Sequence, residues 1–228
     1  MSELVVSEVF GPTFQGEGPS LGRRAGFVRL GRCNLACSFC DTPYTWDWER
    51  HDPEKELSRM DVAALAEQVR AMHVQLVVVT GGEPLLQQSH LIDFLAELHP
   101  CHEVEVETAG TLAPKADLVA AVARFNVSPK LSNSGMPAER RYKPETLRAL
   151  EATNKAAFKF VVTDEESLDE VAQIVDECAL REVWVMPEGT TPDALSERSR
   201  ALADAVLQRG WNLTTRLHVL LWGDERGR

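Results

Sequence analysis

Short runs of apolar, often β-branched residues alternate along the chain with longer segments in which apolar residues recur every three or four positions. The short runs predict buried strands and the longer segments predict amphipathic helices. We expect strands at 25–31, 74–81, 103–110, 125–129, 156–163, 182–189 and 216–222. We expect helices at 61–72, 91–99, 115–125, 143–153, 167–179 and 193–210. This alternation predicts an α/β fold in which crossover helices join parallel strands, as an open sheet or a partial barrel.

Polar, glycine-bearing or cysteine-bearing segments follow almost every predicted strand. In chain order they read "GRC", "TGGEP", "ETAG", "SPK", "VVTD" and "MPEG". Functional residues of parallel sheets and barrels gather at the carboxyl ends of the strands. We therefore expect one site along one rim of the sheet.

Composition narrows the class of protein. The 228 residues are 44% hydrophobic and carry a formal net charge of -11, which is typical of one folded α/β domain and unfavourable for binding nucleic acid. The N-terminal sequence does not read as a signal peptide, and we find no apolar run long enough for a membrane span. We expect a cytoplasmic protein. Its cysteines should then serve metal binding or catalysis rather than disulfides.

Three of the five cysteines fall within eight residues, at Cys33, Cys37 and Cys40. Thiolates favour zinc, copper(I) or iron–sulfur clusters. A structural zinc needs four ligands, and the candidates for a fourth are His51, Cys101 and Cys178. A four-iron cluster held by only three cysteines instead leaves one iron open to another molecule. The spacing also differs from that of the electron-transfer ferredoxins.

The segment "CNLACSFC" resembles the signature of the radical S-adenosylmethionine (SAM) superfamily. The resemblance implies a 4Fe-4S cluster on Cys33, Cys37 and Cys40, with SAM on the fourth iron, and a modified, open TIM-type barrel. It also implies SAM contacts from the cluster loop and from the later strand ends. These residues are Phe39, Cys40, Asp41, Gly81, Gly82, Glu83, Thr108, Ser128, Pro129, Lys130, Met186, Pro187 and Glu188.

A longer resemblance starts at "VFGPTFQGEGPSLGRRAGFVRLG" and continues through "TGGEP", "ETAG", "NVSPK", "FKFVV" and "RLHVLLWG". These segments are similar to the 7-carboxy-7-deazaguanine synthases of queuosine and deazapurine biosynthesis. Such enzymes contract the ring of 6-carboxy-5,6,7,8-tetrahydropterin and release ammonia. They act as homodimers, use Mg²⁺ and need a strong reductant, for which flavodoxin or ferredoxin is the expected donor.

Carried over by position, the resemblance implies a substrate site and a magnesium ligand. Arg29 would pair with the substrate carboxylate, since a guanidinium offers a planar fork of donors. Thr42 would bind Mg²⁺ through its hydroxyl oxygen, the type of ligand that this ion prefers. The other substrate residues would be Phe14, Gln15, Gly16, Glu17, Thr80 and His218. For His218, which we place on the last strand, a structural role in the core is the alternative.

We expect residues 1–228 to form a single radical SAM domain. Residues 1–25 would be an N-terminal segment that carries the substrate loop, and residues 41–60 an insert after the cluster loop. The sequence assigns no function to this insert or to the charged C-terminal segment "GDERGR".

Two other functions remain open from the sequence. A glycyl-radical activating enzyme shares the cysteine spacing but needs an open groove for a protein substrate. A non-enzymatic iron–sulfur or zinc protein would bind metal without cleaving SAM.

Overall fold

The computed structural model describes residues 2–227, and its strands form one sheet. The sheet order is β3-β1-β2-β4-β5-β6-β7-β8-β9. From β2 onward, neighbouring strands run parallel. The strands are β1 (Glu3–Phe14), β2 (Arg24–Leu30), β3 (Ser58–Asp61), β4 (Leu76–Gly81), β5 (Glu103–Thr108), β6 (Arg124–Val127), β7 (Ala156–Val162), β8 (Val183–Pro187) and β9 (Asn212–Leu213).

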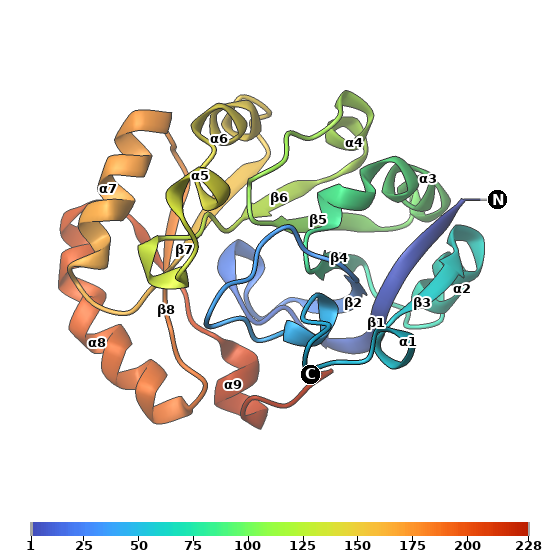
Figure 1. Ribbon diagram of the computed structural model, residues 1–228, viewed down its shortest axis with the longest axis horizontal. Helices are drawn as coiled ribbons and strands as arrows, with labels where there is room; N and C mark the ends of the chain where they lie inside the picture. Colours follow the sequence, from blue (N-terminus) through green and yellow to red (C-terminus); the bar gives the residue numbers. More distant parts are fainter. Residues whose placement is uncertain (1, 228) are drawn as a thin grey trace.

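Helices surround the outer side of this curved sheet, while the cluster loop and the C-terminal segment lie toward its inner side (Figure 1). The helices are α1 (Pro53–Glu56), α2 (Val62–Arg70), α3 (Gln88–Leu98), α4 (Ala116–Ala121), α5 (Ala138–Arg141), α6 (Pro144–Glu151), α7 (Ser167–Cys178), α8 (Pro192–Gln208) and α9 (Leu217–Trp222). This arrangement confirms the predicted open α/β barrel. No helix among the described residues combines the length and the hydropathy that crossing a bilayer requires.

The two faces of the strands differ in chemistry. Val104 and Val106 of β5 belong to the main apolar core with the helices, whereas Glu105 between them is 1% exposed on the opposite face. Glu105 accepts hydrogen bonds from Ser20 Oγ at 2.6 Å and Asn126 Nδ2 at 2.8 Å. Strand β5 is therefore buried on both sides, but its inner face is polar at Glu105.

The N-terminal segment consists of a long strand followed by a short loop. Most of it is β1, which pairs antiparallel with both β2 and β3. The register of β1 against β2 shifts between Phe10 and Thr13, at the Gly11–Pro12 step, which fits the confinement of proline to bulges and strand edges. The loop itself is restricted to the residues between Phe14 and Arg24.

The last predicted strand, 216–222, is wrong, because Leu217–Trp222 is helix α9. Val219 is fully buried while Leu220 and Leu221 are 42% and 50% exposed, so the segment has one buried side only. A short apolar run cannot be assigned to strand or helix by periodicity. The edge of the sheet is instead formed by the two-residue strand β9.

Candidate active site

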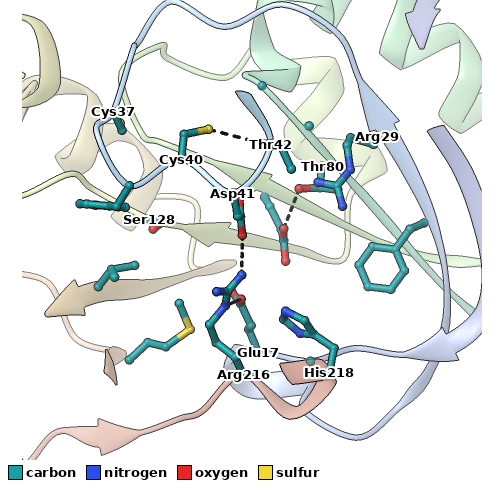
Figure 2. Close-up of a pocket in the computed structure, with 18 of the residues that line it drawn as sticks. Glu17, Arg29, Cys37, Cys40, Asp41, Thr42, Thr80, Ser128, Arg216 and His218 are labelled. Carbon is teal, nitrogen blue, oxygen red and sulfur yellow. Dashed lines mark hydrogen bonds and ion pairs between the residues drawn. The ribbon is translucent and has the colours of Figure 1, made fainter. Parts of the chain in front are cut away.

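The carboxyl ends of the parallel strands surround a cavity of about 500 Å³, a volume within the usual range for a small-molecule site. Most of the residues predicted for the site line this one cavity. They are Phe14, Gln15, Gly16, Glu17, Arg29, Cys33, Cys37, Phe39, Cys40, Asp41, Thr42, Thr80, Gly81, Gly82, Thr108, Ser128, Lys130, Met186, Glu188 and His218. Figure 2 shows Cys37 and Cys40 on one side of the cavity and Arg29 and His218 on the other.

Some predicted residues lie outside the lining. Pro129 and Pro187 are buried behind it. Asp164, from the "VVTD" segment, accepts hydrogen bonds from the backbone N–H and the hydroxyl of Ser167 at the start of α7. A polar residue after a strand can therefore cap the next helix instead of facing the site.

Glu83 is fully buried and also lies outside the lining. Its carboxylate accepts hydrogen bonds from the Thr108 hydroxyl at 2.8 Å, from Ala109 N at 2.8 Å and from Leu85 N at 3.0 Å. Burial raises the pKa of Glu83, although these donors partly oppose the effect. The Glu83 side chain thus connects the loop after β4 to the loop after β5. Of the glycines and the glutamate in "TGGEP", only Gly81 and Gly82 line the cavity.

The cluster loop offers three thiols, two of them in apolar surroundings. All five cysteines of the chain are free, and Leu35, Ala109 and Met136 form a small apolar cluster against which Cys33 and Cys37 pack. Burial raises the pKa of the Cys33 thiol to about 11, so a bound metal must displace its proton. The donor set and the adjoining cavity fit a four-iron cluster with a small molecule beside it.

Gly82 lets the loop after β4 approach the cluster loop. A Cβ at this position would lie 2.0 Å from the carbonyl oxygen of Arg32. The same contact includes a hydrogen bond from Glu83 N to Arg32 O at 2.9 Å. Only glycine fits this approach, which fixes the position of Cys33 relative to β4.

The magnesium prediction stays a prediction. Thr42 is 7% exposed, and its hydroxyl lies 3.7 Å from Cys40 Sγ. Within residues 2–227, no group of three or more His, Cys, Asp or Glu side chains is arranged to hold a metal ion. That finding concerns a single ion bound by several side chains. In a four-iron cluster each thiolate binds a different iron, so the three cysteines need not converge on one point.

Glu107 connects two other elements that line the cavity. Its two carboxylate oxygens accept hydrogen bonds from Gln15 Nε2 at 3.1 Å and from the Thr80 hydroxyl at 2.7 Å. These residues come from the N-terminal loop, β4 and β5. The result is a rim of amide, hydroxyl and carboxylate groups that matches the edge of a polar heterocycle.

Arg29 is held by an acidic partner inside the cavity. Its Nε donates to Glu8 Oε2 at 2.7 Å, and its side chain is 16% exposed. Glu8 also accepts from the Tyr44 hydroxyl at 2.9 Å and pairs with Arg226. Burial would raise the pKa of Glu8, but Arg226 and Arg29 outweigh it and keep the carboxyl ionised. This bond uses Nε, whereas the fork of a guanidinium that pairs with carboxylates includes its terminal nitrogens.

Glu17 joins three parts of the chain. Its carboxylate pairs with Lys159 of β7 and accepts from Arg216 Nε at 3.2 Å. Arg216 also donates to Asp41 Oδ2 at 2.6 Å, one residue after the last cluster cysteine (Figure 2). Burial would raise the pKa of Glu17, but Lys159 and Arg216 lower it well below 4.5.

His218 lies on α9 rather than on a strand, and it contacts the N-terminal loop. A Cβ at Gly16 would lie 2.2 Å from His218 Nδ1, and Leu217 N donates to Gly16 O at 2.8 Å. Burial lowers the pKa of His218, although Glu17 opposes the effect. This lowering favours the neutral ring, which has one donor and one acceptor nitrogen.

Sequence reasoning missed several lining residues. Lys159 and Arg216 stand inside the segments "FKFVV" and "RLHVLLWG" but received no role from the sequence, and Asp224–Gly227 belong to the charged C-terminal segment. The signal for Lys159 was a charged residue in a strand whose neighbours, Phe158 and Phe160, are fully buried. Asp224, Glu225, Arg226 and Gly227 bring the charged C-terminal segment to the cavity.

Comparisons with known proteins agree with this geometry. A family model described as the Radical SAM superfamily matches residues 28–178. The chain is 39% identical to a 7-carboxy-7-deazaguanine synthase of Pyrobaculum aerophilum, covering 98% of this chain and 96% of the relative. It is 29% identical to the Bacillus subtilis enzyme of the same name, covering 98% of each.

A crystal structure of QueE from Escherichia coli has the same fold, with a TM-score of 0.73 and 22% identity over 96% of both chains. The protein is thus a radical SAM enzyme, which implies a 4Fe-4S cluster and SAM as its cofactors. Within this superfamily, the chain belongs to the 7-carboxy-7-deazaguanine synthase family.

Replacing Cys33, Cys37 or Cys40 with Ala removes one of three anchors. We expect each variant to lose most of its iron after anaerobic reconstitution and to lose SAM cleavage. Cys101→Ala is the matched control, because this thiol is exposed and lies outside the cavity. Wild-type iron content and SAM cleavage in Cys37→Ala would refute the ligand assignment.

The lowered pKa of Glu17 makes its contribution depend on pH. Because the folded pKa is below the unfolded value of about 4.5, the stabilisation is present above pH 4.5 and is lost as pH falls toward the folded pKa. Breaking a buried ion pair costs about 3–5 kcal/mol. Denaturant unfolding of the apo-protein should show Glu17→Gln less stable at pH 7 by about this amount, with a smaller difference at pH 4. Glu145→Gln, at a side chain 94% exposed, should show neither effect.

Proposed function

We propose that this protein converts 6-carboxy-5,6,7,8-tetrahydropterin to 7-carboxy-7-deazaguanine with loss of ammonia. The observation that carries the proposal is a largely enclosed guanidinium, Arg29, in the same cavity as the three cysteines of the cluster loop. A radical enzyme that acts on a carboxylated heterocycle needs a cation for the carboxylate and cysteines for the cluster. The names of the relatives support the same reaction.

The residues around the cavity have separable roles in this proposal. Arg29 binds the substrate carboxylate, while Gln15, Thr80 and Glu107 meet the polar edge of the pterin. The stacked rings of Phe10 and Phe27, with centroids 5.0 Å apart, form an apolar wall beside them. The neutral ring of His218 can donate or accept one hydrogen bond at the substrate.

The SAM side consists of the strand-end loops. Gly81, Gly82, Thr108, Ser128, Lys130, Met186 and Glu188 present backbone, hydroxyl, amine and carboxylate groups to the cavity. When bound, the cluster and SAM supply the 5'-deoxyadenosyl radical that removes a hydrogen atom from the substrate. Glu83 lies outside the lining and holds the loop after β5 in place by accepting a hydrogen bond from the Thr108 hydroxyl. Phe39 and Asp41 line the cavity at the cluster loop.

Further parts of the proposal rest on the family resemblance. We expect Mg²⁺ on the Thr42 hydroxyl, a homodimer, one domain over residues 1–228, a cytoplasmic location, and flavodoxin or ferredoxin as the electron donor. The exposed apolar residues Leu213, Leu220 and Leu221 are compatible with a subunit contact.

The experiment that tests the reaction is anaerobic product analysis. Purified enzyme with reconstituted cluster, SAM, dithionite and the carboxypterin should release 7-carboxy-7-deazaguanine and ammonia, detected by mass spectrometry and a coupled ammonia assay. SAM cleavage without this product would exclude the proposed substrate and reopen the glycyl-radical alternative. Iron without any SAM cleavage would favour a non-enzymatic protein.

Arg29→Lys and Arg29→Ala should weaken productive binding of the carboxypterin. Charge-assisted hydrogen bonds contribute about 1.5 to 3 kcal/mol each, so KM should rise at least about tenfold in Arg29→Lys and more in Arg29→Ala. Iron content and the slow SAM cleavage without substrate should stay at the wild-type level. Steady-state kinetics measures the change.

Two controls accompany the Arg29 variants. Arg24→Ala changes an exposed arginine on the same strand, whose guanidinium binds the backbone of Met72 and His73, and it should leave KM unchanged. A pterin without the carboxylate should be bound alike by wild type and Arg29→Ala. An unchanged KM in Arg29→Ala would place the carboxylate contact elsewhere.

Thr42→Val keeps the shape of the side chain and removes its hydroxyl. If that oxygen binds Mg²⁺, turnover should respond less to added magnesium, while iron content stays normal. A magnesium titration of turnover measures the effect. The same half-maximal magnesium concentration in both proteins would show that Thr42 is only a turn residue beside Cys40.

A further inference from the structure

One indole of the 41–60 insert contacts a cluster cysteine directly. Trp46 follows the short 3₁₀ helix Pro43–Thr45, and its Nε1 donates to Cys40 Sγ at 3.3 Å. The donor is therefore the indole N–H and the acceptor is the cysteine sulfur. Trp46 also lines the cavity beside the thiol that it contacts.

The position of this indole is fixed by the backbone around it. Trp46 N donates to Pro43 O at 3.0 Å, and the fully buried Thr45 bonds through its hydroxyl to Thr42 O at 2.8 Å. Thr45 O in turn accepts from Arg32 N at 2.7 Å, next to the first cluster cysteine. The insert is therefore attached to both ends of the cluster loop, and the donor is held in place before any cofactor binds.

The three thiols differ in their donors. Cys33 Sγ accepts from a backbone N–H, that of Leu35, at 3.4 Å. Cys40 Sγ is approached by two side chains, the Trp46 indole and the Thr42 hydroxyl. Two side chains thus meet at the thiol that is adjacent in sequence to Asp41 and its ion pair with Arg216, and the indole is the one that must donate.

Hydrogen bonds to the sulfurs of an iron–sulfur cluster raise its reduction potential. One-electron reduction adds one negative charge to the cluster and its thiolates, and an N–H dipole aimed at a sulfur stabilises the more negative state more strongly. We propose that Trp46 is a positioning residue that raises the reduction potential of the cluster through Cys40. This role concerns electron entry and does not depend on which molecule the enzyme acts on.

The test is an anaerobic redox titration of reconstituted protein with a chemical one-electron reductant, followed by electron paramagnetic resonance of the reduced cluster. Trp46→Phe should shift the midpoint to more negative potential, with about a tenfold lower ratio of reduced to oxidised cluster at a fixed potential, equivalent to about 59 mV for one electron. Trp48→Phe is the matched control, because this tryptophan of the same insert is 41% exposed, and its midpoint should equal that of wild type.

A midpoint in Trp46→Phe equal to that of wild type would overturn the proposal. If Trp46→Phe fails to retain its cluster, benzothienylalanine at position 46 decides the question, since it keeps the ring shape and replaces only the N–H by sulfur. Its midpoint should also be more negative, and an unchanged value would again refute the role. Proton hyperfine spectra of the reduced cluster in H₂O and D₂O give a second readout: the wild type should show an exchangeable proton that both variants lack.

Discussion

A carboxylate buried between two cations, Glu17 with Lys159 and Arg216, is the interaction on which the site depends. It connects the N-terminal loop to the seventh strand and to the segment before α9. Removing Glu17 takes away the carboxylate that both cations share, which is far more costly than losing a surface pair. Gly18 N adds a hydrogen bond to Thr214 Oγ1 at 2.9 Å across the same junction. The loop that carries Gln15 and Gly16 is therefore held from both sides.

The ion pairs of Glu17 and Arg216 also explain how the cluster cysteines and the polar residues of the N-terminal loop come to line one cavity. Cys33 and Cys37 pack in a small apolar cluster after β2, while Gln15 and Glu107 add amide and carboxylate groups to the same cavity. Arg216 bridges them, because it binds Glu17 on one side and Asp41 on the other. Fixed charges between the two regions make their relative position a property of the fold rather than of a bound ligand.

The sequence predicted the parallel sheet and the common rim because strand ends and loop motifs are local features. It missed β1 because Gly11–Pro12 interrupts the apolar alternation, and it took α9 for a strand because six residues carry too little periodicity. The motif at Glu83 predicted nearness to the cavity but not the direction of the side chain. The partners of Glu17 lie 142 and 199 residues away, and no local pattern reports a contact between such distant positions.

The order in which the chain is made has a consequence for this architecture. Synthesis proceeds from the N-terminus, so the loop with Cys33, Cys37 and Cys40 leaves the ribosome long before Arg216 and α9, which close the cavity. The cavity that adjoins the three thiols is therefore complete only after Arg216 and His218 have joined the fold and Glu17 has both of its partners.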